Sequence, residues 1–67
     1  MLENRLKGKI IERGATMDDV ARGIGVHPVT FRRKCKGTSS FTLKEIKGIK
    51  SILNLSEEET KFIFFDE

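Results

Sequence analysis

Apolar residues recur along this chain at intervals of three and four positions, and short polar or glycine-containing breaks separate one series from the next. Such spacing places the apolar side chains on one face of an α-helix. It predicts five helices: residues 2–13, residues 17 to 23 or 24, residues 28–36, one that opens after Thr42, and a short one from Ser56 toward Phe65. The alternating pattern of a β-strand is nowhere sustained, so the expected fold class is all-α. At 67 residues the chain has too little core to divide, and we expect a single domain over residues 1–67.

Residues that typically begin or end helices stand at the predicted boundaries. Thr16 is expected to cap the second helix, whose first turn carries Asp18 and Asp19, where the helix dipole favours negative charge. Pro28 suits the first position of the third helix, which makes His27 its N-cap. The fourth and fifth helices open with the spacing of capping boxes, Thr42 with Glu45 and Ser56 with Glu59. Glycines follow the first three helices, where a left-handed residue can end them: Gly14, Gly25 and Gly37.

The same spacing predicts which side chains form the core. On the first helix they are Leu2, Leu6, Ile10 and Ile11, and on the fourth they are Leu43, Ile46, Ile49, Ile52 and Leu53. Gly48 is expected to weaken the fourth helix by roughly 1 kcal/mol relative to alanine. Cys35 shares a face with Phe31 and is expected to be a small buried side chain. Because cations surround Cys35, a redox role is the alternative.

The distribution of charge along the chain indicates a polyanionic partner. Residues 1–54 contain 12 Lys or Arg and 5 Asp or Glu, a net charge of +7, whereas residues 55–67 contain 1 Lys and 5 Asp or Glu, a net charge of −4. The densest basic stretch comprises Arg32, Arg33, Lys34 and Lys36. Such clustering favours a polyanion as partner, although a solvated charged face would have the same composition.

Several classes of site are not expected. The single cysteine cannot form an internal disulfide or a zinc site, and the single histidine has no second ligand at a suitable spacing, so neither a metal nor a cofactor is predicted. The chain has no acid–base pair, no phosphate-binding glycine loop and too few residues for a closed cleft, so we expect no enzyme and no small-molecule substrate. It has neither the pattern of a signal peptide nor that of a membrane span, which predicts a cytoplasmic protein without a membrane partner.

Residues 16–37, TMDDVARGIGVHPVTFRRKCKG, join two short helices through a glycine turn. Ala21 is small where the two helices are expected to cross, and Gly25 allows the sharp turn between them. The stretch resembles the phage repressor and Cro-type helix-turn-helix family, also called XRE or lambda-repressor-like, at these positions: Thr16, Val20–Ala21, Ile24–Gly25–Val26, Thr30–Phe31 and Gly37. Residues 40–46 are similar to small prophage-type regulators of bacteria.

The resemblance implies a compact five-helix fold and a function. The implied function is that of a transcriptional regulator, encoded by a bacterium, phage or mobile element, that binds double-stranded DNA sequence-specifically. Its helix 28–36 would enter the major groove. Pro28 and Val29 stand where many relatives carry polar side chains that read bases. Readout is therefore expected to shift to Arg32 and Arg33, which can pair with guanine O6 and N7, while Val29 can touch a thymine methyl group.

The remaining expected contacts go to phosphates. Thr16 and Met17 offer amide groups at the start of a helix. The other candidates follow from family position and chemistry: His27, Thr30, Lys36, Thr38, Ser39 and Ser40. Lys34 stands where relatives are often apolar, so its stem is expected to pack while its ammonium group reaches solvent.

The apolar run at the end of the fifth helix allows two interpretations. Four consecutive side chains cannot all face one core, because successive helical residues point about 100° apart. In the first interpretation Phe62 and Phe65 close the core, while Ile63 and Phe64 are frayed. In the second, residues of this run contact a second copy of the chain, giving a homodimer at least on DNA. A different function, a helix-turn-helix module that binds a partner protein through this aromatic tail, is the alternative to DNA binding.

Overall fold

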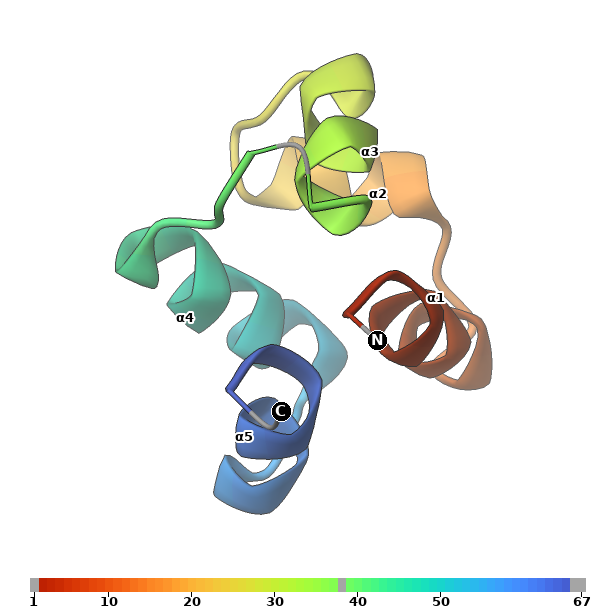
Figure 1. Ribbon diagram of the computed structural model, residues 1–67. Coiled ribbons are helices and arrows are strands. Elements are labelled where there is room, and N and C mark those ends of the chain that lie inside the picture. Colours follow the sequence, from red (N-terminus) through yellow and green to blue (C-terminus); the bar gives the residue numbers. More distant parts are fainter. Residues whose placement is uncertain (1, 38, 66–67) are drawn as a thin grey trace.

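Five helices follow one another in the computed structural model of the chain, which describes residues 2–37 and 39–65. They are α1 (Leu2–Glu12), α2 (Met17–Gly23), α3 (Pro28–Cys35), α4 (Leu43–Leu53) and α5 (Glu57–Phe64). No strand occurs within these two ranges, so the predicted all-α, five-helix fold is confirmed. Helices α2 and α3 lie together at one end of the molecule and α5 at the other, with α1 and α4 on either side (Figure 1). None of these helices is long and apolar enough to cross a membrane.

Side chains fix the starts of four helices. Capping boxes open α2, α4 and α5, and in each the N-cap hydroxyl accepts the amide of the third helical residue: Thr16 from Asp19 at 3.0 Å, Thr42 from Glu45 at 3.1 Å, and Ser56 from Glu59 at 3.0 Å. His27 is the predicted N-cap of α3, and its Nδ1 accepts the Val29 amide at 3.2 Å. These caps explain why the predicted boundaries agree with the observed ones to within about one residue.

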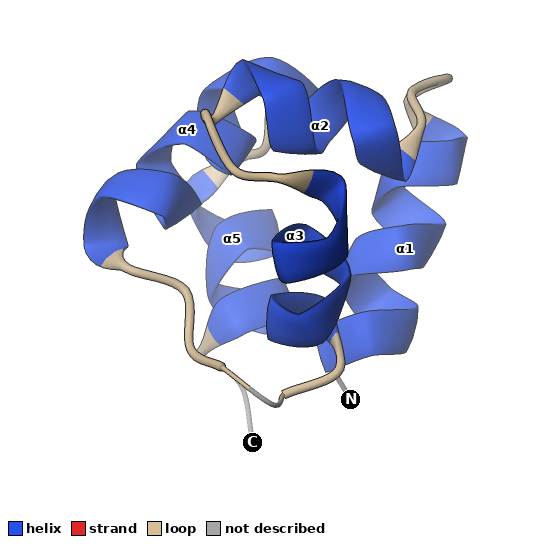
Figure 2. Ribbon diagram, turned by 90° about the horizontal axis from the view of Figure 1, so that it is seen from above, coloured by secondary structure: helices blue, strands red, loops and turns tan. Residues whose placement is uncertain are grey.

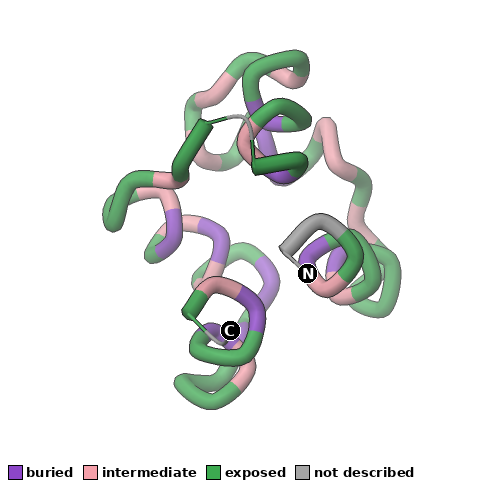
Figure 3. The backbone as a smooth tube through the Cα atoms, viewed as in Figure 1, coloured by how far each residue is buried: buried purple, intermediate pink, exposed green. Residues whose placement is uncertain are grey.

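Buried residues occur on every helix (purple in Figure 3). The core contains Leu6 and Ile10 of α1 together with Ile46, Ile49 and Leu53 of α4, as predicted. Three other predicted core residues are exposed, which corrects the prediction: Ile11, Leu43 and Ile52. A domain this small covers only a narrow stripe of each helix, so apolar residues beside that stripe remain in solvent. The predicted core role of Leu2 lies outside the side chains that the structure describes.

The tail of α5 faces the core with different residues from those expected. Ile63 is buried and Phe64 packs against the core, whereas Phe62 and Phe65 are 51% and 57% exposed. The interpretation in which Phe62 and Phe65 close the core is therefore wrong. Thr60 is buried, and Ile63 and Phe64 follow it by three and four positions, so these residues share the inner face of the helix.

Two glycines allow α2 and α4 to approach closely. A Cβ atom on Gly48 would lie 2.8 Å from Cγ2 of Ile24, and one on Gly23 would lie 2.4 Å from Cδ1 of Ile52. The sequence indicated only the cost of Gly48 to its helix. Because Gly48 has no side chain, Ile24 at the end of α2 can pack directly against the backbone of α4.

Candidate nucleic-acid interface

The turn between α2 and α3 holds the two helices at a fixed crossing. Gly25 adopts the left-handed region, with φ of 74°, and the Val26 amide donates to the Ala21 carbonyl at 2.9 Å. Ala21 has no exposed surface, in agreement with its predicted place at the crossing. A larger side chain at this position would push α2 and α3 apart. The small size of Ala21 therefore helps to set the angle at which α3 crosses α2.

Helix α3 has an inner face that anchors it and an outer face that is open to solvent. Phe31 and Cys35 are buried, and the Phe31 ring meets the Phe41 ring edge-on, with centroids 5.7 Å apart. Burial of Cys35 agrees with the expected role as a small core side chain. The outer face consists of exposed residues spaced by three and four positions: Val29, Arg32, Arg33 and Lys36. In Figure 2 this helix lies nearest the viewer, in front of α5.

The four cations of the basic stretch have different surroundings. Lys34 Nζ donates to both carboxylate oxygens of Glu45, at 2.6 and 2.8 Å, and little of either side chain is exposed. The expectation that the Lys34 ammonium group reaches solvent is therefore wrong, because a carboxylate at the start of α4 holds it. Arg32 lies 3.5 Å from the Asp18 carboxylate. In the described part of the chain, Arg33 and Lys36 have no ion pair, so their charges remain available to an anion.

The Lys34–Glu45 pair connects the outer helix to the rest of the fold. Glu45 also accepts the Thr42 amide at 2.9 Å in the capping box of α4. The hydrogen bonds from Lys34 and then from Thr42 lower the pKa of the Glu45 carboxyl. The side chain that caps α4 therefore also holds α3, and Lys34 supports the outer face without belonging to it.

The start of α3 presents few polar groups. Val29 is 48% exposed, Thr30 is exposed, and Pro28 is partly buried. Because His27 Nδ1 accepts the Val29 amide, the proton of a neutral imidazole is assigned to Nε2, which remains a donor. His27 and Thr30 thus retain hydrogen-bond donors at the surface, whereas Pro28 and Val29 offer only apolar contact.

The other candidate phosphate contacts lie at the start of α2 and in the loop after α3. Thr16, Ser39 and Ser40 are exposed. The expectation that the Thr16 amide is open to a phosphate is wrong, because this amide donates to Oδ2 of Asp19 at 3.2 Å in the capping box. Met17 packs its side chain against the core, which leaves its amide as the group that an anion could reach. Thr38 lies outside the described residues. Two acids share the first turn of α2, so an anion there would meet negative charge from Asp18 and Asp19.

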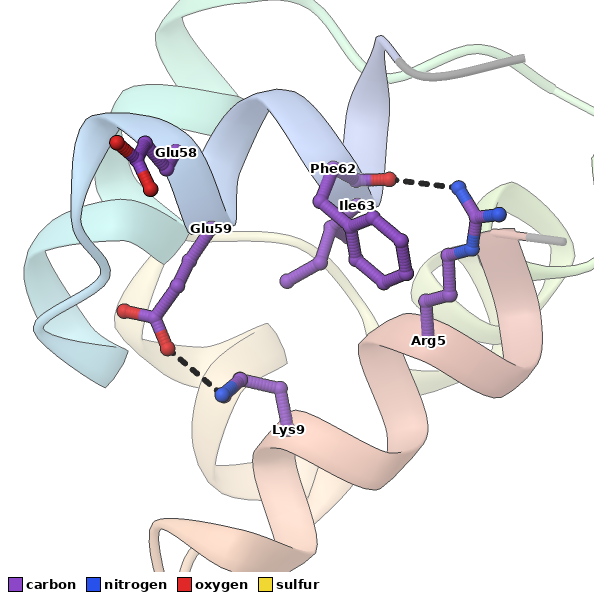
Figure 4. Close-up of a pocket in the computed structure, with 6 residues that line it drawn as sticks. All are labelled: Arg5, Lys9, Glu58, Glu59, Phe62 and Ile63. Carbon is purple, nitrogen blue, oxygen red and sulfur yellow. Dashed lines mark hydrogen bonds and ion pairs between the residues drawn. The ribbon is translucent and has the colours of Figure 1, made fainter.

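Helices α1 and α5 are joined by charged and aromatic contacts on either side of an open groove (Figure 4). The Arg5 guanidinium lies 4.0 Å from the centroid of the Phe62 ring and donates to the Phe62 carbonyl at 2.8 Å. Glu59 accepts from Lys9 at 2.7 Å and from Arg13 at 3.2 Å. The carboxylate of Glu59 thus holds two helices and the Ser56 capping box together.

This arrangement predicts an acid-sensitive step in the stability of the fold. The hydrogen bonds from Lys9 and from the Ser56 amide lower the pKa of Glu59 from 4.5 to about 2. A lowered pKa means that Glu59 stabilises the fold above pH 4.5 and that this contribution is lost as the pH falls from 4.5 to about 2. Glu59→Gln should therefore have a smaller loss of stability across that range, measured by urea denaturation at each pH.

The matched control for this measurement is Glu58→Gln, because Glu58 is an exposed acid of the same helical turn. The control should retain the decrease in stability that the wild type undergoes. An equal decrease in wild type and Glu59→Gln would contradict the assignment of this step to Glu59.

The sequence did not predict two ion pairs around α3, that of Asp18 with Arg32 and that of Lys34 with Glu45. Both join residues more than ten positions apart on different helices, where helical periodicity carries no information. The charge pattern identified the cations but not their partners.

Comparison with known proteins agrees with the observed geometry. The family model of the Cro/C1-type HTH DNA-binding domain matches residues 5–59, a range that includes α2, the glycine turn, α3 and all of α4. Searches of curated proteins and of solved structures found no match. Because the family match covers most of the sequence and the helix-turn-helix is present, the chain belongs to the Cro/C1-type helix-turn-helix family of DNA-binding domains.

Proposed function

We propose that the chain is a transcriptional regulator that recognises a specific double-stranded DNA sequence, with the outer face of α3 in the major groove. The observation that carries this proposal is the single exposed face formed by Val29, Arg32, Arg33 and Lys36. The buried residues Phe31 and Cys35 fix the opposite face of the same helix, so the outer side chains project from a rigid element. The major groove is wide enough to admit an α-helix, and only there does each base pair present a distinct pattern.

The outer face divides into groups that read bases and groups that bind the backbone. Arg33 and Arg32 can donate two hydrogen bonds each to guanine, and Val29 can contact a thymine methyl group. Pro28 is partly buried and contributes at most the edge of its ring. Lys36 follows the last residue of α3, whereas base contacts of such a helix come from its N-terminal part, so we assign Lys36 to a phosphate. The same assignment is made for exposed hydroxyl and imidazole groups: Thr16, His27, Thr30, Ser39 and Ser40.

We also propose that two copies bind one site. Phe62 and Phe65 are half exposed at the end of α5, and an apolar pair in solvent is suited to contact a second copy. Ile63 and Phe64 pack inside the same helix, so they are not part of this proposed contact. Because Ile63 and Phe64 pack inward, less of the aromatic tail is open for the alternative function, a helix-turn-helix module that binds a partner protein through this tail.

Selection of binding sites from random duplex DNA tests the proposal. We expect one enriched motif, and a two-fold symmetric motif if two copies bind. Affinity for the selected duplex should fall steeply with salt, with a slope of about −0.9 in log–log form for each phosphate contacted.

The outcomes separate the parts of the proposal. Binding without any enriched motif would contradict sequence-specific recognition, and a motif without symmetry, bound by a monomer in sedimentation analysis, would contradict the dimer. Indifference to duplex DNA at low salt would favour the partner-binding alternative.

A further inference from the structure

Asp18 and Arg32 connect the two helices of the motif at the edge of the outer face. Oδ1 of Asp18 lies 3.5 Å from Nη2 of Arg32. That oxygen has less than 1 Å² of accessible surface and, within the described residues, no hydrogen bond. The Asp18 side chain as a whole is 43% exposed, so the cost of removing a carboxylate oxygen from water falls on Oδ1, and the nearby guanidinium supplies the opposite charge there. The position of Asp18 is thus linked to that of Arg32.

The neighbouring acid, Asp19, has a different role from that of Asp18. Asp19 accepts the Thr16 amide at 3.2 Å and closes the capping box of α2. The start of a helix favours negative charge, and Asp19 alone provides it. The helix dipole therefore does not by itself explain the presence of Asp18. Asp18 makes no contribution to the capping box, and its carboxylate is directed at Arg32 on the next helix.

On the basis of the proposed function, we propose that Asp18 is a positioning residue that sharpens the base preference of Arg32. More than half of the Arg32 side chain is exposed, so without a partner it would sample many rotamers and lose that freedom on binding. The Asp18 carboxylate restricts the guanidinium to one side of α3 before DNA arrives. The same negative charge repels phosphates, so it lowers affinity for every duplex while it raises discrimination at one base pair.

A double-mutant cycle tests this proposal. The base pair read by Arg32 is identified first, as the one whose preference Arg32→Ala reduces most. Asp18→Asn keeps the size of the side chain and removes its charge. It should lower discrimination at that pair by roughly 2- to 10-fold, the range expected from freeing one long side chain, and increase affinity for unrelated duplexes. In the Arg32→Ala background the same substitution should leave discrimination at that base pair unchanged.

The controls separate positioning from a structural role. Glu58→Gln makes the same acid-to-amide change at an exposed site on α5 and should leave discrimination unaltered. In the free protein, the NMR order parameter of the Arg32 Nε–H group should decrease in Asp18→Asn, and this readout needs no DNA.

Each outcome supports or overturns the proposal. If Asp18→Asn changes the melting temperature but leaves discrimination intact, Asp18 only stabilises the start of α2, and the proposal is overturned. If discrimination changes equally in the Arg32→Ala background, Asp18 contacts the base itself, which also overturns positioning. A wild type without any base preference would instead contradict the proposed function, and the order parameter would still report whether Asp18 restrains Arg32.

Discussion

Arg33→Ala should lower affinity for the selected duplex by about 10- to 100-fold and relax the preference at one base pair, the usual effect of losing a bidentate contact to guanine. Arg33 is the arginine of the outer face that has no ion pair in the described part of the chain. Its guanidinium can therefore form both hydrogen bonds without first leaving a carboxylate. Equilibrium binding to the selected duplex and to its single-base variants measures both effects.

Lys36→Ala provides the comparison, because Lys36 is exposed on the same face one turn closer to the end of α3. A lost phosphate contact should weaken all duplexes alike and reduce the slope of log affinity against log salt by about 0.9. If Arg33→Ala also weakened all duplexes equally, Arg33 would be a phosphate contact, and base reading would rest on Arg32 and Val29.

Features of the fold that depend on residues close together in the sequence could be predicted from it. Helix boundaries follow from caps such as Thr42 with Glu45 and from glycines such as Gly25, which act within a few residues of their own positions. The outer and inner faces of α3 could also be predicted, since Phe31 and Cys35 mark one side of a regular helix. The family match over residues 5–59 agrees with the resemblance that these local features suggested.

Features that depend on packing between helices could not be predicted in the same way. In the run from Phe62 to Phe65, every residue is apolar, so the pattern does not indicate which of them faces inward. That choice follows from the docking of α5 on α1, in which Glu59 binds Lys9 and Thr60 is buried. Likewise, Gly48 could be assessed only as a helix residue until its proximity to Ile24 was known.

Phe31→Ala should unfold most of the protein at 37 °C. Truncating a fully buried phenylalanine costs about 3–5 kcal/mol, and the single core of a chain of this length rarely supplies more than about 3–5 kcal/mol of stability in total. The ring also begins an edge-to-face series with Phe41 and Phe64, each pair 5.7 Å apart, that joins α3 to α5. Its removal therefore releases α3 from the rest of the core, an effect that thermal and urea unfolding followed by circular dichroism will measure.

Phe62→Ala is the matched control, since it removes the same side chain from a site that is half exposed. It gives up the contact with Arg5, and a cation–π contact at an exposed site contributes about 0.5–1 kcal/mol, so most molecules should stay folded. Because DNA binds only the folded form, an excess of the selected duplex should restore helicity to Phe31→Ala by mass action. Equal destabilisation by the two substitutions would contradict the placement of Phe31 at the centre of the core and Phe62 at its edge.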